Sequence, residues 1–478
     1  MGPELAKNIP QVNSNRASNT TRQIKDSIVI APTDSIEIKN IISDMKLTSS
    51  CGVDNIPISV LKSIKTNISP ILSILINHSI TNCSFPDALK IAKITPIFKQ
   101  GDKSLVTNYR PISLLNTFSK IYEKVFSNRL NNFLTKHNII YEKQFGFQKH
   151  RSTAQAIASF VDTVTESLDK NDYVLSLFID LSKAFDTIDH KILLQKLYHY
   201  GIRGVAYDYL KSYLSNRFQC VEIENVTSYF LPITCGVPQG SILGPLLFLL
   251  YINDIHECSN LLKLLLFADD TTIMHASNNI DELITTINTE LTFILKWFYQ
   301  NRLSLNVKKT NYIIFSNRKK IPVHADLIIA NLKIEKVEST KFLGVEIEDK
   351  LNWWNHTRSV ERKLSSAIFI IRSLRYKINR TTSLKLYDTL FLPYLLYCNI
   401  IWGNTHKTYT LNICRLQKRA LKLCHGRNLL NRKNLFTETN KLPFHDIHML
   451  QTSLVVFQYF HNLATLPNCI ASLFKKNF

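Results

Sequence analysis

Apolar and polar positions along the chain follow two different periods. Apolar residues spaced three and four apart predict helices over 34–45, 69–82, 119–133, 153–168, 190–200, 207–214 and 283–298. Short, largely apolar runs predict strands at 173–179, 218–224, 228–234, 264–267, 271–274 and 312–315. From residue 353 onward the pattern is helical, with basic and aromatic residues mixed in. The chain is therefore predicted to mix helices with strands, with its strands in the first three quarters.

Two helix starts have clear signals. Asp34 precedes Glu37 at the spacing of a capping box. Ser69 followed by Pro70 is typical of an N-cap and the first helical position. The helix that follows is predicted to run to about residue 82, with four residues on one face, among them a packed histidine: Ile71, Ile74, Leu75 and His78.

A pair of adjacent carboxylates, Asp269 and Asp270, lies between two apolar runs, Leu264–Phe267 and Thr271–Met274. This pattern predicts a tight hairpin with both acids at its tip. Two such acids repel each other unless a cation lies between them. Ligands that are all oxygen favour Mg²⁺ or Mn²⁺ over zinc. A solvated Asp-Asp turn is the common alternative.

A third acid, Asp180, directly follows the apolar run Tyr173–Ile179. The chain between Asp180 and the hairpin is long enough for crossover helices between strands of one sheet. If Asp180 ends a strand beside the hairpin, three carboxylates converge. Such a cluster can hold two metal ions about 4 Å apart for an in-line phosphoryl displacement.

Several collinear segments around these acids resemble reverse transcriptases. They are KITPIFKQGD with NYRPISL, QFGFQKHRST, FIDLSKAF, GVPQGSILGPLLF, FADD, NRLSLNVKKT and KFLGVEI. Their flanks are similar to the enzymes of non-LTR retrotransposons, close to jockey-like elements. The resemblance runs from about Ser49 to Asp349 and, more loosely, to the C-terminus.

This resemblance implies an RNA-templated DNA polymerase of α+β class and right-hand architecture, with fingers, a palm built on a split βαβ antiparallel sheet, and a helical thumb. The implied parts are a disordered lead (1–30), N-terminal helices and fingers (31–172), a palm (173–350) with a helical insert (190–214), and a thumb with a C-terminal extension (351–478). The implied partners are an RNA template, a DNA primer, the RNA–DNA duplex and dNTPs.

The resemblance also assigns the metal site. Two Mg²⁺ ions, with Mn²⁺ as a possible substitute, are expected at Asp180, Asp269 and Asp270, with Ile179 and Leu181 beside Asp180 in the ligand set. These three aspartates are the implied catalytic residues. Lys309 matches the lysine proposed to protonate pyrophosphate as it leaves. A structural lysine at a strand start is the alternative for that position.

Three further positions match residues of the family that contact the nucleotide, and a neighbouring glycine is a further candidate for binding it. Lys99 and Arg110 match a fingers segment that grips the triphosphate, although such cations are ordinarily only the solvated face of a strand. Gln239 matches the residue that contacts the incoming nucleotide and its template partner. Gly240, like Gly236, would let the backbone approach a ligand closely.

Phe185 matches an aromatic residue that packs under the deoxyribose and collides with a 2′-hydroxyl. A phenylalanine that merely fills the core is the alternative.

The segment Gln144–Thr153 interleaves aromatic and basic residues, a pattern that suits either the binding of a template strand or an ordinary packed loop.

Composition agrees with a nucleic-acid partner. The formal net charge of +21 over 478 residues calls for a polyanion, with an anionic membrane surface as the second choice. No apolar run reaches the length of a membrane-spanning helix, and the N-terminus lacks a signal-peptide pattern, so we expect an intracellular protein with no membrane partner.

The nine cysteines include no CxxC pair, which predicts free thiols. Cys414, Cys424 and His425 lack the second close pair that a zinc site needs.

The basic amphipathic stretch Ile413–His425 is typical of membrane or calmodulin binding, but after a palm it fits a thumb helix along the duplex better.

Two other functions of the chain stay open. A decayed element could bind nucleic acid without polymerising, although all three acids are intact. A related palm could act on free nucleotides, as nucleotide cyclases do, although the fingers and Gly236–Ser241 segments argue against it. We expect the polymerase segment alone, with no endonuclease, ribonuclease H or zinc knuckle.

Overall fold

The computed structural model describes residues 23–461 except residues 49, 225 and 426–434. The chain forms two compact units, each assembled from several segments. The first unit comprises Met1–Phe147, Asp180–Leu261 and Thr289–Asn306, and the second comprises Gln148–Ile179, Leu262–Asn288 and Val307–Phe478. Within the described residues, no helix is both long enough and apolar enough to cross a membrane.

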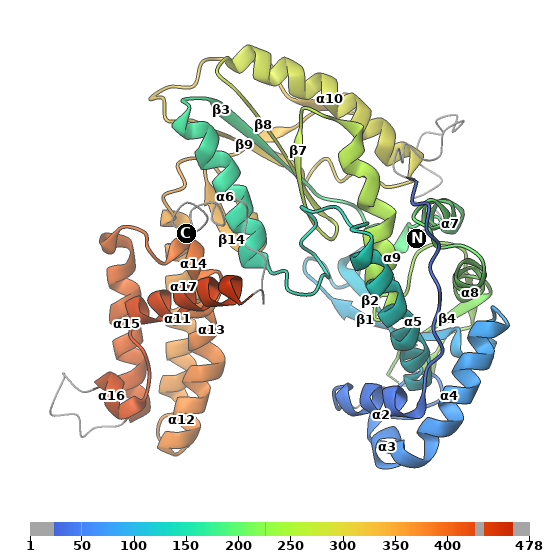
Figure 1. The fold of residues 1–478 in the computed structure, drawn as a ribbon. Helices are drawn as coiled ribbons and strands as arrows, with labels where there is room; N and C mark the ends of the chain where they lie inside the picture. The colour runs from blue at the N-terminus through green and yellow to red at the C-terminus, as the bar shows by residue number, and fades with distance from the viewer. Residues whose placement is uncertain (1–22, 49, 225, 426–434, 462–478) are drawn as a thin grey trace. The chain divides into compact units, whose positions relative to one another are not determined.

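A mostly antiparallel sheet of order β12-β9-β3-β8-β7 forms the centre of the second unit (Figure 1). Its strands are β3 (Tyr173–Ile179), β7 (Lys263–Phe267), β8 (Asp270–Ser277), β9 (Asn311–Phe315) and β12 (Glu335–Lys336). The central strand β3 pairs antiparallel with both β8 and β9, and almost all of its residues are buried. An almost continuously apolar strand is what a position between two partners and under a helix requires.

Helix α6 (Thr153–Asp169) leads into β3 and packs against β3 and β7. It begins with a complete capping box, in which Ser152 and Gln155 satisfy each other's backbone amides. The remaining elements of this unit are β10 (Ile328–Ile329), β11 (Leu332–Lys333), β13 (Ser339–Phe342), β14 (Val345–Glu348), α11 (Trp354–Leu374), α12 (Arg380–Leu386), η5 (Tyr387–Phe391), α13 (Leu392–Leu396), α14 (Asn399–Trp402), α15 (Lys407–His425), α16 (Leu435–Thr439) and α17 (Phe444–Phe460). Among these helices α11 packs along α15, and α17 lies against α13 and α14.

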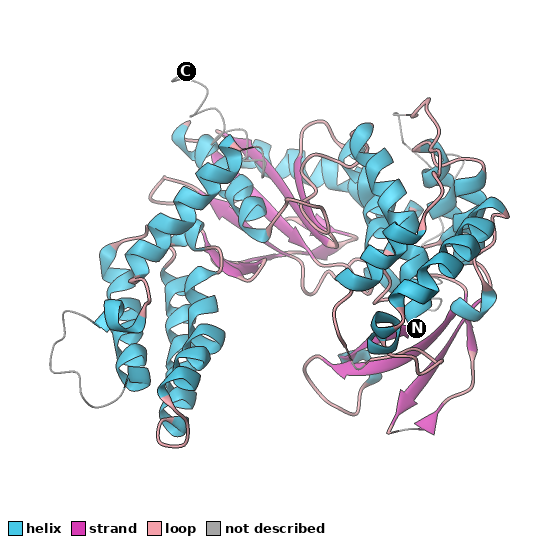
Figure 2. Ribbon diagram, turned by 60° about the horizontal axis from the view of Figure 1, so that its bottom comes forward, coloured by secondary structure: helices cyan, strands magenta, loops and turns pink. Residues whose placement is uncertain are grey.

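The first unit contains a second sheet, of order β2-β1-β4-β5 with β6 also paired to β4 (Figure 2). Its strands are β1 (Ile91–Phe98), β2 (Tyr109–Leu115), β4 (Arg217–Ile223), β5 (Val226–Thr227) and β6 (Leu231–Ile233). Its helices are α2 (Ser35–Asp44), α3 (Ile58–Ser63), α4 (Lys65–Thr81), η1 (Asp87–Leu89), η2 (Val106–Asn108), α5 (Thr117–Lys136), η3 (Ala184–Asp186), α7 (His190–His199), α8 (Val205–Leu214), α9 (Leu243–Ile252) and η4 (Asn253–Cys258). Helix α10 (Ile280–Gln300) belongs partly to each unit.

The predicted face of the helix after Ser69 is wrong. Helix α4 begins at Lys65, so Pro70 lies in its second turn. Ile71, Ile74 and Leu75 are 58%, 69% and 49% exposed, and His78 is exposed as well. The buried residues of α4 are three apolar ones, Leu72, Ile76 and Ile80, and three serines whose hydroxyls donate to backbone carbonyls: Ser69 to Lys65, Ser73 to Pro70 and Ser79 to Ser84.

The last residues of the predicted disordered lead are ordered. The amide of Ile24 donates to the carbonyl of His199 at 3.1 Å, and that of Ile28 donates to the carbonyl of Gly201 at 3.0 Å. Gly201 has a φ of +87°, and a Cβ there would lie 2.4 Å from the carbonyl oxygen of Asp26. Residues 1–22 of the predicted lead lie outside the described part of the chain.

A fully buried ion pair fixes α7 to the end of α9 in the first unit. The ammonium of Lys196 lies 2.6 Å from Asp254 and also donates to the carbonyl of Tyr251, and the two charged side chains are 0% and 2% exposed. We expect Asp254→Ala to lower the free energy of unfolding by about 3–5 kcal/mol, because it leaves a buried charge unpaired. Chemical denaturation of this variant checks the value. Lys333→Ala, which breaks an exposed pair with Asp326, is the control and should cost at most about 1 kcal/mol. Equal losses for both would contradict the prediction.

Candidate active site

The predicted Asp-Asp hairpin is confirmed in the second unit. Phe267 pairs with Asp270, so Ala268 and Asp269 form a two-residue turn between β7 and β8. Ala268 takes a left-handed backbone with φ of +56°, as the first position of such a turn requires. Asp269 is half-buried and Asp270, the first residue of β8, is exposed. The sheet thus presents two adjacent carboxylates at the end of a hairpin whose strands are firmly paired.

Asp180 belongs to the first unit, where a segment from far along the chain holds it. Its carbonyl accepts from the amide of Asn306 at 2.9 Å, and its carboxylate accepts from the Nδ2 of Asn306 at 3.0 Å. The neighbouring residue Leu181 forms a β-bridge with Leu305. Asn306 was not among the predicted site residues, although it lies inside the segment NRLSLNVKKT that carries part of the resemblance.

The pairing of strands β3 and β8 involves the residues next to two of the predicted site acids, Asp180 and Asp270. Ile179, the last residue of β3, pairs with Thr271, the second residue of β8. Asp180 and Asp270 are the residues next to this pair in the sequence. Within the described residues, no group of three or more His, Cys, Asp or Glu side chains is gathered so that it could hold a metal ion. Magnesium suits the adjacent aspartates nonetheless, because it prefers oxygen, keeps several waters and is often held by one or two carboxylates together with substrate phosphates.

The loop Gly236–Ser241 of the first unit is bound to strand β2. The amide of Ser113 donates to the carbonyl of Gln239 at 2.8 Å. Gly240 has a φ of +134°, and a Cβ there would lie 2.5 Å from the carbonyl oxygen of Ser113. Similarly, a Cβ on Gly236 would lie 2.8 Å from the carbonyl oxygen of Asp186. Both glycines therefore permit a close approach to the protein's own backbone, while their predicted approach to a ligand stays a prediction.

The segment after Asp180 lies along the other side of this loop. The amide of Val237 donates to the carbonyl of Phe185 at 2.9 Å, and the ring of His190 donates through Nε2 to the carbonyl of Gly236 at 2.7 Å. The Nε2 of Gln239 donates to the carboxylate of Asp186 at 2.8 Å. Burial raises the pKa of Asp186, and the hydrogen bond from Gln239 opposes that rise. Sequence reasoning missed Asp186 and His190, although both lie in the stretch FIDLSKAFDTIDH.

Phe185, the predicted sugar gate, packs on one side against α9. Its ring stacks on Phe248 with centroids 4.5 Å apart and an interplanar angle of 24°. The ring of Phe147 packs edge-on against the ring of Phe185, with centroids 6.1 Å apart. Part of the Phe185 surface remains exposed. A ring held in place yet partly accessible suits a gate, and that role stays a prediction.

The predicted triphosphate grip lies on the hairpin of β1 and β2. Arg110 pairs with Ile97, and Lys99 lies two residues beyond Ile97, so Lys99 and Arg110 share one face of the ribbon. Both side chains are exposed. Lys93 points to the same face but forms an ion pair with Glu222 at 3.0 Å, which gives it a structural partner. The other predicted proton donor, Lys309 of the second unit, is exposed just before β9.

A buried carboxylate of α5 supports the start of α9. Glu123 is fully buried and accepts from the amides of Ile242 and Leu243 at 2.7 and 3.1 Å. Burial raises the pKa of Glu123, and these two amides oppose the rise. The carboxylate occupies the N-terminal end of α9, where amides lack helical partners. It thereby fixes the backbone immediately after Gly240 and Ser241.

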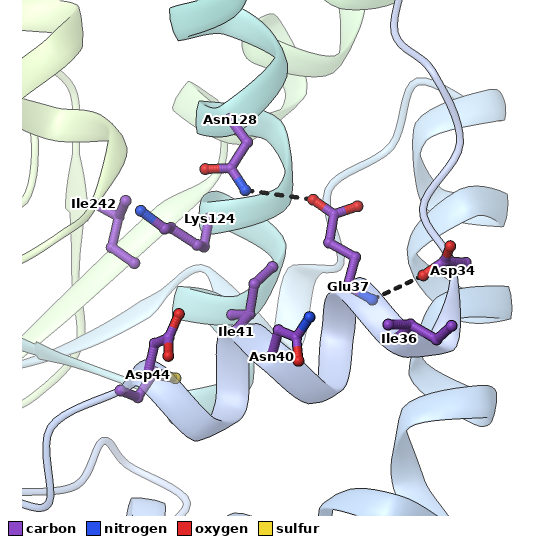
Figure 3. Close-up of a pocket in the computed structure, with 10 residues that line it drawn as sticks. Asp34, Ile36, Glu37, Asn40, Ile41, Asp44, Lys124, Asn128 and Ile242 are labelled. Carbon is purple, nitrogen blue, oxygen red and sulfur yellow. Dashed lines mark hydrogen bonds between the residues drawn. The ribbon is translucent and has the colours of Figure 1, made fainter.

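A pocket of about 720 Å³ lies between α2 and α5 in the first unit (Figure 3). Three of its polar residues, Asp34, Glu37 and Asn128, have hydrogen-bond partners within the protein. Asp34 accepts from the amide of Glu37, confirming the predicted N-cap, and Glu37 accepts from Asn128 and Arg129.

The chain belongs to the reverse transcriptase (RNA-dependent DNA polymerase) family, whose pattern matches residues 97–347. The family match, with helices and a largely antiparallel central sheet, confirms the predicted α+β right-hand polymerase class. Members of this family use divalent metal ions and bind RNA templates and other nucleic acids.

The relatives confirm the predicted likeness to non-LTR retrotransposon enzymes. The chain is 30% identical to a probable RNA-directed DNA polymerase from transposon BS of Drosophila melanogaster, over 83% of this chain and 45% of the relative. It is 26% identical to that of the X-element from the same fly, over 83% of this chain and 44% of the relative, and 26% identical to that of the mobile element jockey, over 82% and 43%. The chain thus spans less than half the length of these curated relatives. Among solved structures, the chain is similar to a telomerase from Candida albicans, with 12% identity and a TM-score of 0.43 over 75% of this chain and 68% of the telomerase chain.

Proposed function

We propose that this chain is an RNA-directed DNA polymerase that extends a primer 3′-hydroxyl with dNTPs on an RNA template. The observation that carries the proposal is the family match over residues 97–347 together with an intact Asp180 and an intact Asp269-Asp270 hairpin. The register that pairs Ile179 with Thr271, next to Asp180 and Asp270 in the sequence, supports a shared role for these acids.

In this proposal Asp180, Asp269 and Asp270 hold two Mg²⁺ ions, with Ile179 and Leu181 flanking Asp180 in the ligand set. When bound, these ions favour the deprotonated primer hydroxyl and neutralise the charge on the departing pyrophosphate. The exposed cations Lys99 and Arg110 bind the triphosphate, because guanidinium and ammonium groups suit phosphate oxygens. Gln239 and Gly240 lie against the base pair being formed, and Lys309 donates a proton to pyrophosphate.

Primer extension on poly(rA)/oligo(dT) with dTTP, with and without Mg²⁺, tests the function. We expect elongation that requires Mg²⁺ and persists in part with Mn²⁺. Duplex binding without elongation under either metal would overturn the proposal in favour of a decayed element that only binds nucleic acid. A parallel incubation with free nucleotides separates the remaining alternative, since a cyclase-like palm would convert them without a primer.

Duplex binding is expected to depend on the basic face of α15. Arg415, Lys418 and Lys422 are exposed at helical spacing, while Ile413, Gln417 and Cys424 are buried on the opposite side. Replacing the three cations by Gln should weaken duplex affinity and should flatten its dependence on salt concentration, by roughly one unit of log–log slope for each phosphate that the variant no longer neutralises. Fluorescence anisotropy across a salt series measures both quantities.

The control for this prediction removes the same charge elsewhere. Lys136, Lys191 and Lys211 are exposed lysines on α5, α7 and α8 of the first unit. Their triple Gln variant changes net charge equally but should leave the salt slope nearly unchanged. If the salt slope falls by the same amount in both triple variants, α15 has no special part in binding and the protein's overall charge accounts for it.

A further inference from the structure

The side-chain amide of Gln239 has a defined partner on the protein side. Its Nε2 donates to Oδ1 of Asp186 at 2.8 Å, and its backbone carbonyl accepts from Ser113. Gln239 is therefore held at two points, by its backbone on β2 and by its side chain on the segment that follows Asp180. Both Gln239 and Asp186 are partly buried, which strengthens a charge-assisted hydrogen bond.

A carboxylate determines which way such an amide faces. An amide group has a donating end and an accepting end that are nearly identical in shape, so a partner that can both donate and accept, such as a hydroxyl or another amide, can hold it in two orientations. An ionised carboxylate only accepts. It therefore keeps the NH₂ end of Gln239 on Asp186 and leaves the carbonyl Oε1 facing away from that partner.

The surroundings hold Asp186 itself in place. Its carbonyl accepts from the thiol of Cys235 at 3.4 Å, and Gly236 packs against its backbone too closely to admit a Cβ. Its amide donates to the carbonyl of Lys183 at 2.9 Å. The backbone of Asp186 is thus fixed on both sides of the carboxylate that accepts from Gln239. A fixed acceptor is what an amide of defined orientation requires.

We infer that Asp186 is a positioning residue for nucleotide selection: it orients the amide of Gln239 so that the carbonyl end is presented to the incoming nucleotide and its template partner. The inference rests on the proposed function, in which Gln239 contacts the nucleotide. It adds a residue that touches no substrate but controls the hydrogen-bonding pattern that the substrate meets.

Asp186→Asn is the direct test, because it keeps the size of the side chain but adds a donor. The substituted amide can accept from one orientation of Gln239 and donate to the other, so both orientations become available. We expect the KM for the correct dNTP to rise roughly tenfold and misincorporation to rise by a similar factor, the amount that one charge-assisted hydrogen bond supplies, with kcat nearly unchanged. Steady-state single-nucleotide insertion opposite each template base measures these quantities.

Asp189→Asn is the matched control. Asp189 lies three residues further on in the same segment, but its carboxylate caps α7 by accepting from the amides of Lys191 and Ile192. Asn is also a good N-cap, so the fold is retained. The other carboxylate oxygen pairs with Arg302 at 2.6 Å, with the Arg302 and Asp189 side chains 55% and 14% exposed, so the loss of this ion pair should affect stability and not the orientation of Gln239. This variant should keep the wild-type KM and the wild-type misincorporation frequency.

A double variant separates orientation from a general loosening of the loop. In the Gln239→Ala background, Asp186→Asn should change neither KM nor misincorporation further, because the amide that it orients is gone. Additive effects in that background, or a single Asp186→Asn variant that extends primers with wild-type KM and selectivity, would overturn the inference. A wild-type chain that fails to extend primers at all would instead refute the proposed function, so the two failures are distinguishable.

Discussion

Asp269→Asn is expected to abolish primer extension, with a loss of at least about 10³-fold, while the fold stays intact. The substitution removes one negative charge from a pair of adjacent carboxylates at the β7–β8 turn. A neutral amide is a poorer ligand for a hard divalent cation than a carboxylate. Since the catalysis of phosphoryl transfer is almost entirely positioning and electrostatic stabilisation, little activity should remain. Extension rates at saturating dNTP and Mg²⁺ measure the loss.

Two further measurements distinguish a lost metal site from a damaged fold. Removing the repulsion between Asp269 and Asp270 should leave the metal-free protein as stable as the wild type or slightly more stable. Mg²⁺ should raise the melting temperature of the wild type but not that of the variant. Asp281→Asn, which neutralises an exposed acid in the first turn of α10, should keep wild-type extension. Wild-type extension by Asp269→Asn would show that the metal assignment is wrong.

Phe185→Val is expected to admit ribonucleotides while lowering the melting temperature only modestly. The ring is held by its stack on Phe248, and part of it stays exposed. If that exposed part lies beneath the sugar, a smaller side chain removes the collision with a 2′-hydroxyl. The ratio of rNTP to dNTP incorporation, measured together with thermal melting, gives both effects.

Phe126→Val is the control, because it shows how the truncation of a purely structural phenylalanine affects stability and nucleotide selection. Phe126 is fully buried in the first unit and stacks on Tyr209 with centroids 4.9 Å apart. Truncation of such a residue should cost up to about 3–5 kcal/mol and should leave the nucleotide ratio unchanged. If Phe185→Val behaves in the same way, with a large loss of stability and unchanged discrimination, then Phe185 is a core residue and not a gate.

The sequence alone determined the local elements near the acids. Strand β3 is apolar along nearly its whole length, and the two runs around Asp269 and Asp270 allow only a short turn between them. Such features depend on residues close together in the chain, so their periodicity is sufficient to predict them. The collinear motifs added the family, which no single pattern of apolar residues could supply.

Only the tertiary structure decided which face of α4 is buried and which distant residues meet. Helix α4 has apolar residues on two faces, so its periodicity left the choice open; packing in the folded chain buries Leu72, Ile76 and Ile80 and leaves Ile71, Ile74 and Leu75 exposed. Likewise, the partners Asn306 of Asp180, Asp186 of Gln239 and Glu123 of the α9 amides are each more than fifty residues away in the sequence. Hydrogen bonds across such separations leave no periodic signal along the chain, because they depend on how the backbone brings the segments together and not on the spacing of residue types.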